Sequence, residues 1–255
     1  MTDFTLGVVG SSRKENEHRL PVHPRHLGRI PAACRPQLRF ERGYGSRFGL
    51  AEAELETYCG GLLGREELLA ACDVVVLPKV TPEDLRAMRP GAVLWGWPHC
   101  VQQREIAQAA IDRRLTLIAF EAMYHWLRSG ARGVHSFARN NELAGYCAVL
   151  HAFDTRGIDG HYGPPRRAAV LGFGAVSRGA VYALQGRGVH EITAYTQRST
   201  HRVRDRIFGC RHLKMRRSAD GKSMKAVLDD GAAVPLAERL AAVDDVEAAR
   251  LLHHQ

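Results

Sequence analysis

Short apolar runs alternate with helix-length stretches along the first half of the chain, and this alternation constrains the fold more than any other feature. The apolar runs span 5–9, 73–77, 92–97 and 115–120, and residues 102–113 have a helical pattern. Strands that alternate with helices of this length form βαβ units, in which the strands are parallel. The sequence therefore predicts an α/β fold with mainly parallel sheets.

A polar, glycine-containing stretch at 128–136 separates this pattern from a second one. Such a stretch is typical of a boundary between domains. A helix is predicted over 141–153, and a new strand begins at Arg167. We therefore expect one domain over 1–135 and another over 136–255.

The second domain contains a glycine-rich turn directly after a buried strand. The strand at 168–171 leads into the sequence GFGAVS, and a helical pattern comes next. The first glycine permits a sharp bend, and the second lets the main chain approach a pyrophosphate, which the N–H groups of the helix start would bind. This context predicts a Rossmann-type dinucleotide site, and a βα turn without a ligand is the alternative. The residues expected to hold the pyrophosphate are Gly172, Gly174, Ala175, Val176 and Ser177.

The choice between NAD(H) and NADP(H) depends on the residues at the end of the next strand, which is predicted at 191–195. An NAD site has an acidic residue there for the ribose 2′-hydroxyl, but 192–200 contains no Asp or Glu. Arg198 and Ser199 stand there instead, and a guanidinium beside a hydroxyl suits a 2′-phosphate. We predict NADP(H) as the preferred cofactor, with NAD(H) as the alternative. Arg198 as a solvated loop residue is the competing interpretation.

A series of short motifs in the first half resembles one enzyme superfamily. RKENEHRLPVHP at 13–24 resembles the K-E-x-x-x-E-x-R-V-x-x-x-P opening of the alanine dehydrogenase and transhydrogenase superfamily. The other motifs occur in that family's order: GYG at 43–45, LPKV at 77–80, GWPH at 96–99 and NELAGY at 141–146. The GWPH form and the acid-free second strand of the nucleotide-binding domain look more like the carboxyethylornithine synthases than the alanine dehydrogenases. The resemblance spans about residues 6–200.

This resemblance implies an oxidoreductase acting on CH–NH or CH–NH2 groups. A pyruvate-like 2-oxo acid would condense with an amine, and the imine would accept a hydride from the nicotinamide. Arg19 would bind the substrate carboxylate, Lys79 would hold the carboxylate or polarise the carbonyl, and His99 would be the general acid/base. Glu121, which also stands after a strand, would help to orient the site. As an alternative, each of these side chains is an ordinary surface or structural residue.

The resemblance ends near Thr200, and an exposed helix is predicted at 243–252. We expect one more strand or hairpin and a helix, at 226–228 and 234–240, so the nucleotide-binding domain would be incomplete and a matching catalytic aspartate is missing. A relative that binds a dinucleotide or a partner without catalysis is therefore the alternative function. The basic run at 202–217 suggests nucleic-acid binding, but only Phe208 is aromatic, and we interpret the run as a charged, solvated loop.

Composition limits the remaining classes. The formal charge of +9 favours anionic partners, among them a phosphorylated cofactor and carboxylate substrates. No apolar run approaches the roughly 20 residues of a membrane span, and the N-terminus lacks a secretory pattern, so we expect a cytoplasmic protein without membrane contact. The 6 cysteines form no CxxC pair, and we expect no metal site. An incomplete sheet edge predicts a homo-oligomer.

Overall fold

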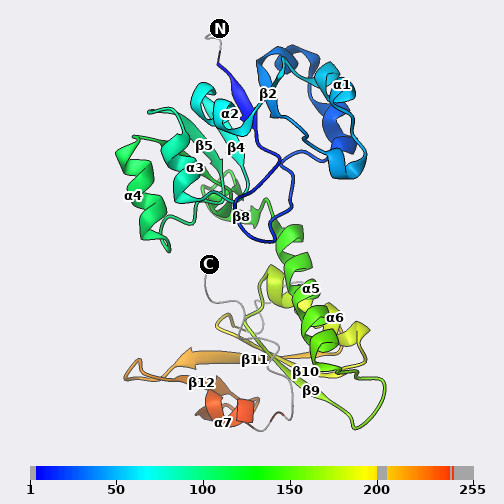
Figure 1. Cartoon of the computed structure of the whole chain (residues 1–255). Helices are drawn as coiled ribbons and strands as arrows, with labels where there is room; N and C mark the ends of the chain where they lie inside the picture. The colour runs from blue at the N-terminus through cyan, green and yellow to red at the C-terminus, as the bar shows by residue number, and fades with distance from the viewer. Residues whose placement is uncertain (1–3, 200–205, 242, 244–255) are drawn as a thin grey trace. The chain divides into compact units, whose positions relative to one another are not determined.

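The computed structural model describes residues 4–199, 206–241 and 243. The chain divides into two units, Met1–Gly133 and Val134–Gln255. Figure 1 draws both units.

The first unit is built on a six-stranded sheet with the order β3-β2-β1-β4-β5-β6, and every neighbouring pair is parallel. This is the strand order of a doubly wound Rossmann sheet. The chain builds the sheet outward from β1 in one direction and, from β4 on, outward in the other. The predicted α/β class is confirmed. The strands are β1 (Leu6–Val8), β2 (Leu38–Glu41), β3 (Leu62–Leu63), β4 (Val74–Leu77), β5 (Val93–Gly96) and β6 (Thr116–Ala119).

Helices cover both faces of this sheet. One face packs the strand residues Val75, Leu77 and Leu94 against α2, α3 and α4, and the other packs Val8 and Phe40 against η1, α1 and the adjoining loops. The α-helices are α1 (Glu52–Leu55), α2 (Arg65–Ala71), α3 (Pro82–Ala87) and α4 (Arg104–Asp112). The 3-10 helices are η1 (Pro24–Arg29), η2 (Ala32–Gln37), η3 (Ser46–Phe48), η4 (Glu56–Tyr58) and η5 (Phe120–Ala122). A hairpin of β7 (Tyr124–Trp126) and β8 (Arg132–His135) forms a separate two-stranded sheet.

The second unit contains a mixed sheet with the order β13-β12-β11-β10-β9. Its strands β9, β10 and β11 are parallel, whereas β12 and β13 are antiparallel to their neighbours. The strands are β9 (Arg167–Leu171), β10 (Glu191–Thr196), β11 (Cys210–Arg217), β12 (Met224–Val227) and β13 (Ala233–Pro235). The helices are α5 (Ala138–Arg156), α6 (Ala175–Gly186) and α7 (Leu236–Ala241).

Helices α5 and α6 cover one face of this sheet and α7 the other, as Figure 1 shows. Glycines let α5 and α6 pack closely. A β-carbon on Gly145 would lie 1.9 Å from the carbonyl oxygen of Val176, and one on Gly179 would lie 1.7 Å from that of Glu142. The start of α6, which follows the glycine turn, is therefore held against α5 by contacts that no larger residue would allow.

The basic run at 202–217 does not form the solvated loop expected from its charge. Residues 202–205 lie outside the described residues, but Cys210–Arg217 form β11, parallel to β10. Leu213 and Met215 are buried while the cationic side chains between and beside them are exposed, which is the pattern of a half-buried strand. Strand β11 was not predicted, and it adds to the strand or hairpin that the sequence predicted after Thr200. The helix predicted at 243–252 lies outside the described residues from 244 on.

Membrane-spanning helices and metal clusters are both absent from the residues that the structure describes. Within 4–199, 206–241 and 243, no helix has the length and apolarity needed to cross a membrane. In that part of the chain, no three His, Cys, Asp or Glu side chains gather as potential metal ligands. All six cysteines are free thiols.

Candidate active site

Lys79 and His99 meet where two neighbouring strands of the first unit end. Lys79 stands after β4, His99 stands after β5, and these strands are paired in parallel. The ammonium nitrogen Nζ of Lys79 lies 2.7 Å from Nε2 of His99. Ligands of open α/β sheets bind at such carboxyl ends. The fold thus brings together two of the residues that the sequence predicted for one site.

The protonation states of this pair depend on burial and charge. Burial, followed by the positive charges of Arg19 and Lys14, lowers the pKa of Lys79 to about 8. Burial and the neighbouring Lys79 also lower the pKa of His99. At neutral pH the lysine is therefore an ammonium and the imidazole is neutral. The ammonium donates to Nε2, which assigns the ring proton of His99 to Nδ1.

Glu121 holds His99 in an unusual backbone conformation. His99 has a φ of 47°, in the left-handed region that non-glycine residues rarely adopt. Its backbone N–H donates to Oε1 of Glu121 at 2.8 Å, and Nδ1 lies 3.7 Å from the same oxygen. Strained conformations of this kind persist only where surrounding contacts enforce them. The expectation that Glu121 helps to orient the site agrees with this arrangement.

Trp97 brings the cationic groups to one surface. The Cζ atom of Arg19 lies 4.7 Å from the centroid of the Trp97 ring, and Nζ of Lys79 lies 5.5 Å from it. Glu17 accepts hydrogen bonds from the backbone N–H and Nε of Arg19, each at 2.9 Å, and these bonds lower the pKa of Glu17. Two cations over one aromatic ring can bind a carboxylate in a partly water-excluded place. Neither Trp97 nor Glu17 was predicted as a site residue, although each stands inside a motif that indicated the site.

The glycine turn of the second unit has the local geometry expected of a phosphate loop. Gly172 has a φ of 90°, and its N–H donates to the carbonyl of Tyr195 at 2.7 Å. Gly174 is the N-cap of α6 and makes no side-chain cap, and a β-carbon built on it has no atom within 4 Å. Ser177 is 7% exposed and packs beneath the turn, with Oγ 3.5 Å from the carbonyl of Leu171. A side chain at position 174 would therefore meet open space, directly before Ala175 and Val176 at the start of α6.

Phe173, between the two glycines, anchors the turn. Its ring is 7% exposed and meets the ring of His212 edge-on, with 4.3 Å between centroids. The Cζ atom of Arg178 lies 5.3 Å from the centroid of the Phe173 ring. His212 belongs to β11, so the strand that the sequence did not predict also supports this loop.

Arg198 and Ser199 stand after the carboxyl end of β10, the strand beside β9. The backbone N–H of Arg198 donates to Oγ1 of Thr196 at 3.2 Å, and the side chain of Arg198 is exposed. The residues thus lie at the edge of the sheet where the glycine turn also begins. Their role toward a 2′-phosphate stays a prediction.

Comparisons with known proteins agree with the motifs. The model of the family described as alanine dehydrogenase/PNT, N-terminal domain, matches residues 8–144. N(5)-(carboxyethyl)ornithine synthase of Clostridium botulinum is 24% identical over 212 residues, which are 75% of this chain and 62% of that protein. The chain therefore spans less than two thirds of the length of this relative. The resemblance predicted from the sequence is confirmed.

Solved structures agree with the fold. The transhydrogenase from Sinorhizobium meliloti matches with a TM-score of 0.57 and 19% identity, over 76% of this chain and 59% of that one. An L-alanine dehydrogenase matches with a TM-score of 0.57 and 17% identity, over 76% of this chain and 55% of that one. At these identities the likeness extends to the fold alone.

Proposed function

Because the chain belongs to the alanine dehydrogenase/PNT N-terminal domain family, we propose that it is an NADP(H)-dependent oxidoreductase that joins a pyruvate-like 2-oxo acid to an amine. The first unit would bind the substrates and the second the cofactor. The observation that carries this proposal is the contact of 2.7 Å between the ammonium of Lys79 and the imidazole of His99, at the strand ends where Arg19 also lies over Trp97.

Arg19 and Lys79 supply the charge for the 2-oxo acid. Glu17 holds Arg19 through two hydrogen bonds of 2.9 Å, one from the backbone N–H and one from Nε of the guanidinium, and Trp97 covers one side of both cations. A carboxylate bound here exchanges water for charge-assisted hydrogen bonds, which are stronger than neutral ones. The ketone carbon of the acid then lies within reach of the Lys79–His99 pair.

His99 and Lys79 are suited to move the protons of the condensation. The amine nitrogen attacks the carbonyl carbon and loses protons, and the carbonyl oxygen gains two protons and leaves as water. The ammonium of Lys79, with its pKa of about 8, can give a proton to the carbonyl oxygen, and this frees Nε2 of the neutral His99 imidazole to accept a proton from the amine. A proton transfer from Nε2 of His99 to Nζ of Lys79 then restores the starting protonation states of both residues.

The second unit fits a dinucleotide phosphate. NADP(H), when bound, supplies the hydride, and NAD(H) is the alternative cofactor. The open space at Gly174 is where the main chain can meet a pyrophosphate, with Gly172, Ala175, Val176 and Ser177 completing the turn. Arg198 and Ser199 would take the 2′-phosphate by charge-assisted hydrogen bonds.

The test monitors the absorbance of the reduced nicotinamide. Purified protein is mixed with NADPH, pyruvate and one amine at a time, including ammonium, ornithine and lysine. NADPH consumption that needs both pyruvate and an amine supports the proposal. NADPH binding without consumption contradicts it and favours a non-catalytic dinucleotide-binding relative. DNA binding that falls steeply with salt and ignores NADPH would instead support the nucleic-acid interpretation.

We also propose that the chain forms a homo-oligomer. Within the described residues, β9 pairs with β10 on one side and ends the sheet on the other, and exposed strand edges favour pairing with another chain. Light scattering on the purified protein tests this, and a monomeric mass contradicts it.

A further inference from the structure

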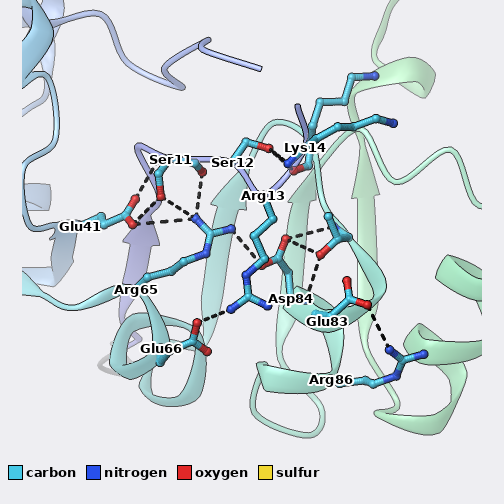
Figure 2. Close-up of polar contacts among 12 residues, drawn as sticks. Ser11, Ser12, Arg13, Lys14, Glu41, Arg65, Glu66, Glu83, Asp84 and Arg86 are labelled. Atoms are coloured by element: carbon cyan, nitrogen blue, oxygen red, sulfur yellow. Dashed lines mark hydrogen bonds and ion pairs between the residues drawn. The ribbon is translucent and has the colours of Figure 1, made fainter. Parts of the chain in front are cut away.

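Arg65, at the start of α2, connects two loops of the candidate active site (Figure 2). Its Nη1 donates to the carbonyl oxygen of Ser11 at 2.9 Å and to Oγ of Ser11 at 2.8 Å. Its Nη2 donates to Oδ1 of Asp84 at 2.9 Å. The Arg65 side chain is 14% exposed and that of Asp84 is 0% exposed, so the ion pair is shielded from water.

Glu41 fixes the first of these loops, which begins after β1. The carboxylate oxygen Oε2 accepts the backbone N–H groups of Gly10 at 2.7 Å and Ser11 at 2.8 Å, and Oε1 accepts the hydroxyl of Ser11 at 2.6 Å. Glu41 is 9% exposed, and its Oε1 lies 3.8 Å from Nη1 of Arg65. Figure 2 shows Ser11 between the two charged side chains. This loop continues toward Arg19.

Asp84 fixes the second loop, which begins after β4 and carries Lys79. Its Oδ2 accepts the backbone N–H of Thr81 at 3.0 Å and the Thr81 hydroxyl at 3.1 Å, forming a capping box at the start of α3. Thr81 stands two residues after Lys79. The hydroxyl of Ser12, in the first loop, donates to the carbonyl oxygen of Lys79 at 3.3 Å. The backbone of Lys79 is therefore held from both sides.

We infer that Arg65 is a positioning residue that holds the loop of Arg19 against the loop of Lys79, so that both cations meet one substrate carboxylate. The inference rests on the proposed function, because the carboxylate that the two cations would bind is that of the 2-oxo acid. Arg65 acts through Ser11 and Asp84. A guanidinium serves both acceptors because its donors form a rigid planar fork, whereas an ammonium is a single point charge.

The first test replaces Arg65 by lysine, which keeps the charge and removes the fork. Arg65→Lys is expected to raise KM for the 2-oxo acid by about tenfold, because small displacements of binding groups have effects of this size or larger. The dissociation constant of NADPH is expected to stay the same. The matched control is Arg89→Lys, because Arg89 forms an exposed ion pair with Asp73 in the same unit. It should leave both constants unchanged.

The second test reports on Lys79 without any turnover. The rate at which an amine-specific acylating reagent labels Lys79 is measured by peptide mass spectrometry from about pH 6 to 11, across the range in which lysines titrate, with the exposed Lys222 as an internal reference. The pKa of Lys79 is about 8 because of burial and nearby cations. Looser loops admit water and separate the cations, so the midpoint should rise in Arg65→Lys and, less, in Ser11→Ala. The charged and titratable groups that act on Lys79 are Arg19, Lys14, Glu17, Glu121 and His99.

The outcomes separate the two proposals. If the unsubstituted protein consumes no NADPH with any amine, the proposed reaction is wrong, and the labelling midpoint still decides whether Arg65 positions Lys79. If Arg65→Lys does not fold, Ser11→Ala decides, since it removes only one hydroxyl. A midpoint that stays in place in the folded variants, or that moves equally in Arg89→Lys, overturns the inference and leaves Arg65 with a purely structural role.

Discussion

The loop after β1 and the loop after β9 stand at similar places in their units, but their main-chain N–H groups have different partners. In the first unit, Gly10 and Ser11 donate to the carboxylate of Glu41, and a β-carbon on Gly10 would lie 2.6 Å from the ring of Tyr44. In the second unit, Gly174 begins α6 without a side-chain cap and faces open space. One loop is closed by the protein's own side chains, and the other has no side-chain cap at its helix start.

This difference is the structural basis of the proposed division of roles between the two units. Glu41 ends β2, next to β1, and its carboxylate takes the N–H groups that an anion would otherwise use. The corresponding strand of the second unit, β10, ends at Thr196 with no carboxylate before Arg198. Topology alone does not decide ligand binding. The proposed function accordingly assigns the dinucleotide to the unit whose helix start has no side-chain cap, and the proton chemistry to the other.

The largest effect is expected from His99→Ala, which should remove catalysis in the first unit and leave cofactor binding in the second. Loss of a general acid/base lowers kcat by about a hundredfold to ten-thousandfold. Binding of NADPH should persist, because the substitution lies in the first unit. Stopped assays with and without pyruvate measure the rate, and calorimetry measures NADPH binding. His151→Ala, at an exposed position of α5, is the control and should keep full activity. Equal rates for the two variants would remove His99 from the site.

Gly174→Val is expected to weaken cofactor binding in the second unit. A branched side chain would fill the open space at the start of α6 and weaken NADPH and NADH alike by about a hundredfold. Gly64→Val is the matched control, because Gly64 is also the extended N-cap of a helix, and a β-carbon placed on it would have no atom within 4 Å. Calorimetry with both nucleotides measures the loss. Retained affinity in Gly174→Val would show that no diphosphate approaches this turn.

The sequence was most informative where the determining contacts are local. The strand, the turn at Gly172 and the start of α6 lie within a short stretch, so their pattern was readable without the fold. Arg65 and Asp84 are 19 residues apart, and Glu41 and Gly10 are 31 apart, so only the packed sheet brings them together. The capping box of Thr81 and Asp84 is a local pattern, but no local pattern distinguishes Arg65 or Glu41 from solvated charged residues.

Two further features were hidden for other physical reasons. Strand β11 was missed because its exposed positions carry Arg and Lys, whose charge drew attention away from the buried Leu213 and Met215. The left-handed φ of His99 could not be anticipated, because it depends on a hydrogen bond to Glu121, 22 residues away. The GWPH motif indicated where His99 lies, but not that Trp97 would face Arg19 and Lys79 together.

The pH dependence of substrate binding tests whether the charge of Lys79, in the first unit, binds the 2-oxo acid. The pKa of Lys79 is lowered to about 8, so its charge is present below that pH and is lost above it. Affinity for the 2-oxo acid should therefore fall by up to about tenfold per pH unit above this pKa, and binding there should take up a proton. Calorimetry in buffers of different ionisation enthalpy measures both quantities. Lys79→Arg should abolish the inflection, and an inflection that survives it would belong to another group.

Arg198→Ala tests whether the second unit binds the 2′-phosphate of NADPH through this residue. A lost charge-assisted hydrogen bond weakens NADPH binding by about tenfold or somewhat more, whereas NADH, which lacks the 2′-phosphate, should bind as before. Gln197→Ala, at the exposed neighbouring position, is the control and should change neither. Fluorescence titration with both reduced nucleotides gives the ratio of affinities. A loss of equal size for both nucleotides would contradict a contact with the 2′-phosphate.

The smallest effect is expected from Glu41→Ala, which removes the carboxylate from the loop after β1 and so makes this loop resemble the loop after β9. Glu41→Ala would expose the N–H groups of Gly10 and Ser11 beside Arg65, so sulfate could take the place of the lost carboxylate. Sulfate at about ten times its dissociation constant stabilises a protein by about 1.4 kcal/mol, which raises Tm by a few degrees. Thermal unfolding in sulfate and in chloride of equal ionic strength measures the difference.

The matched control for this experiment is Glu52→Ala. Glu52 also accepts a backbone N–H, from Gly43 at 2.7 Å, but its side chain is 48% exposed. Water can replace the Glu52 carboxylate, so sulfate should add no more stability to Glu52→Ala than to the unsubstituted protein. The specific gain in Glu41→Ala depends on N–H groups that are shielded and already aimed at an anion. If both variants respond alike, the β1 loop is not an anion site closed from within, and the two loops differ for another reason.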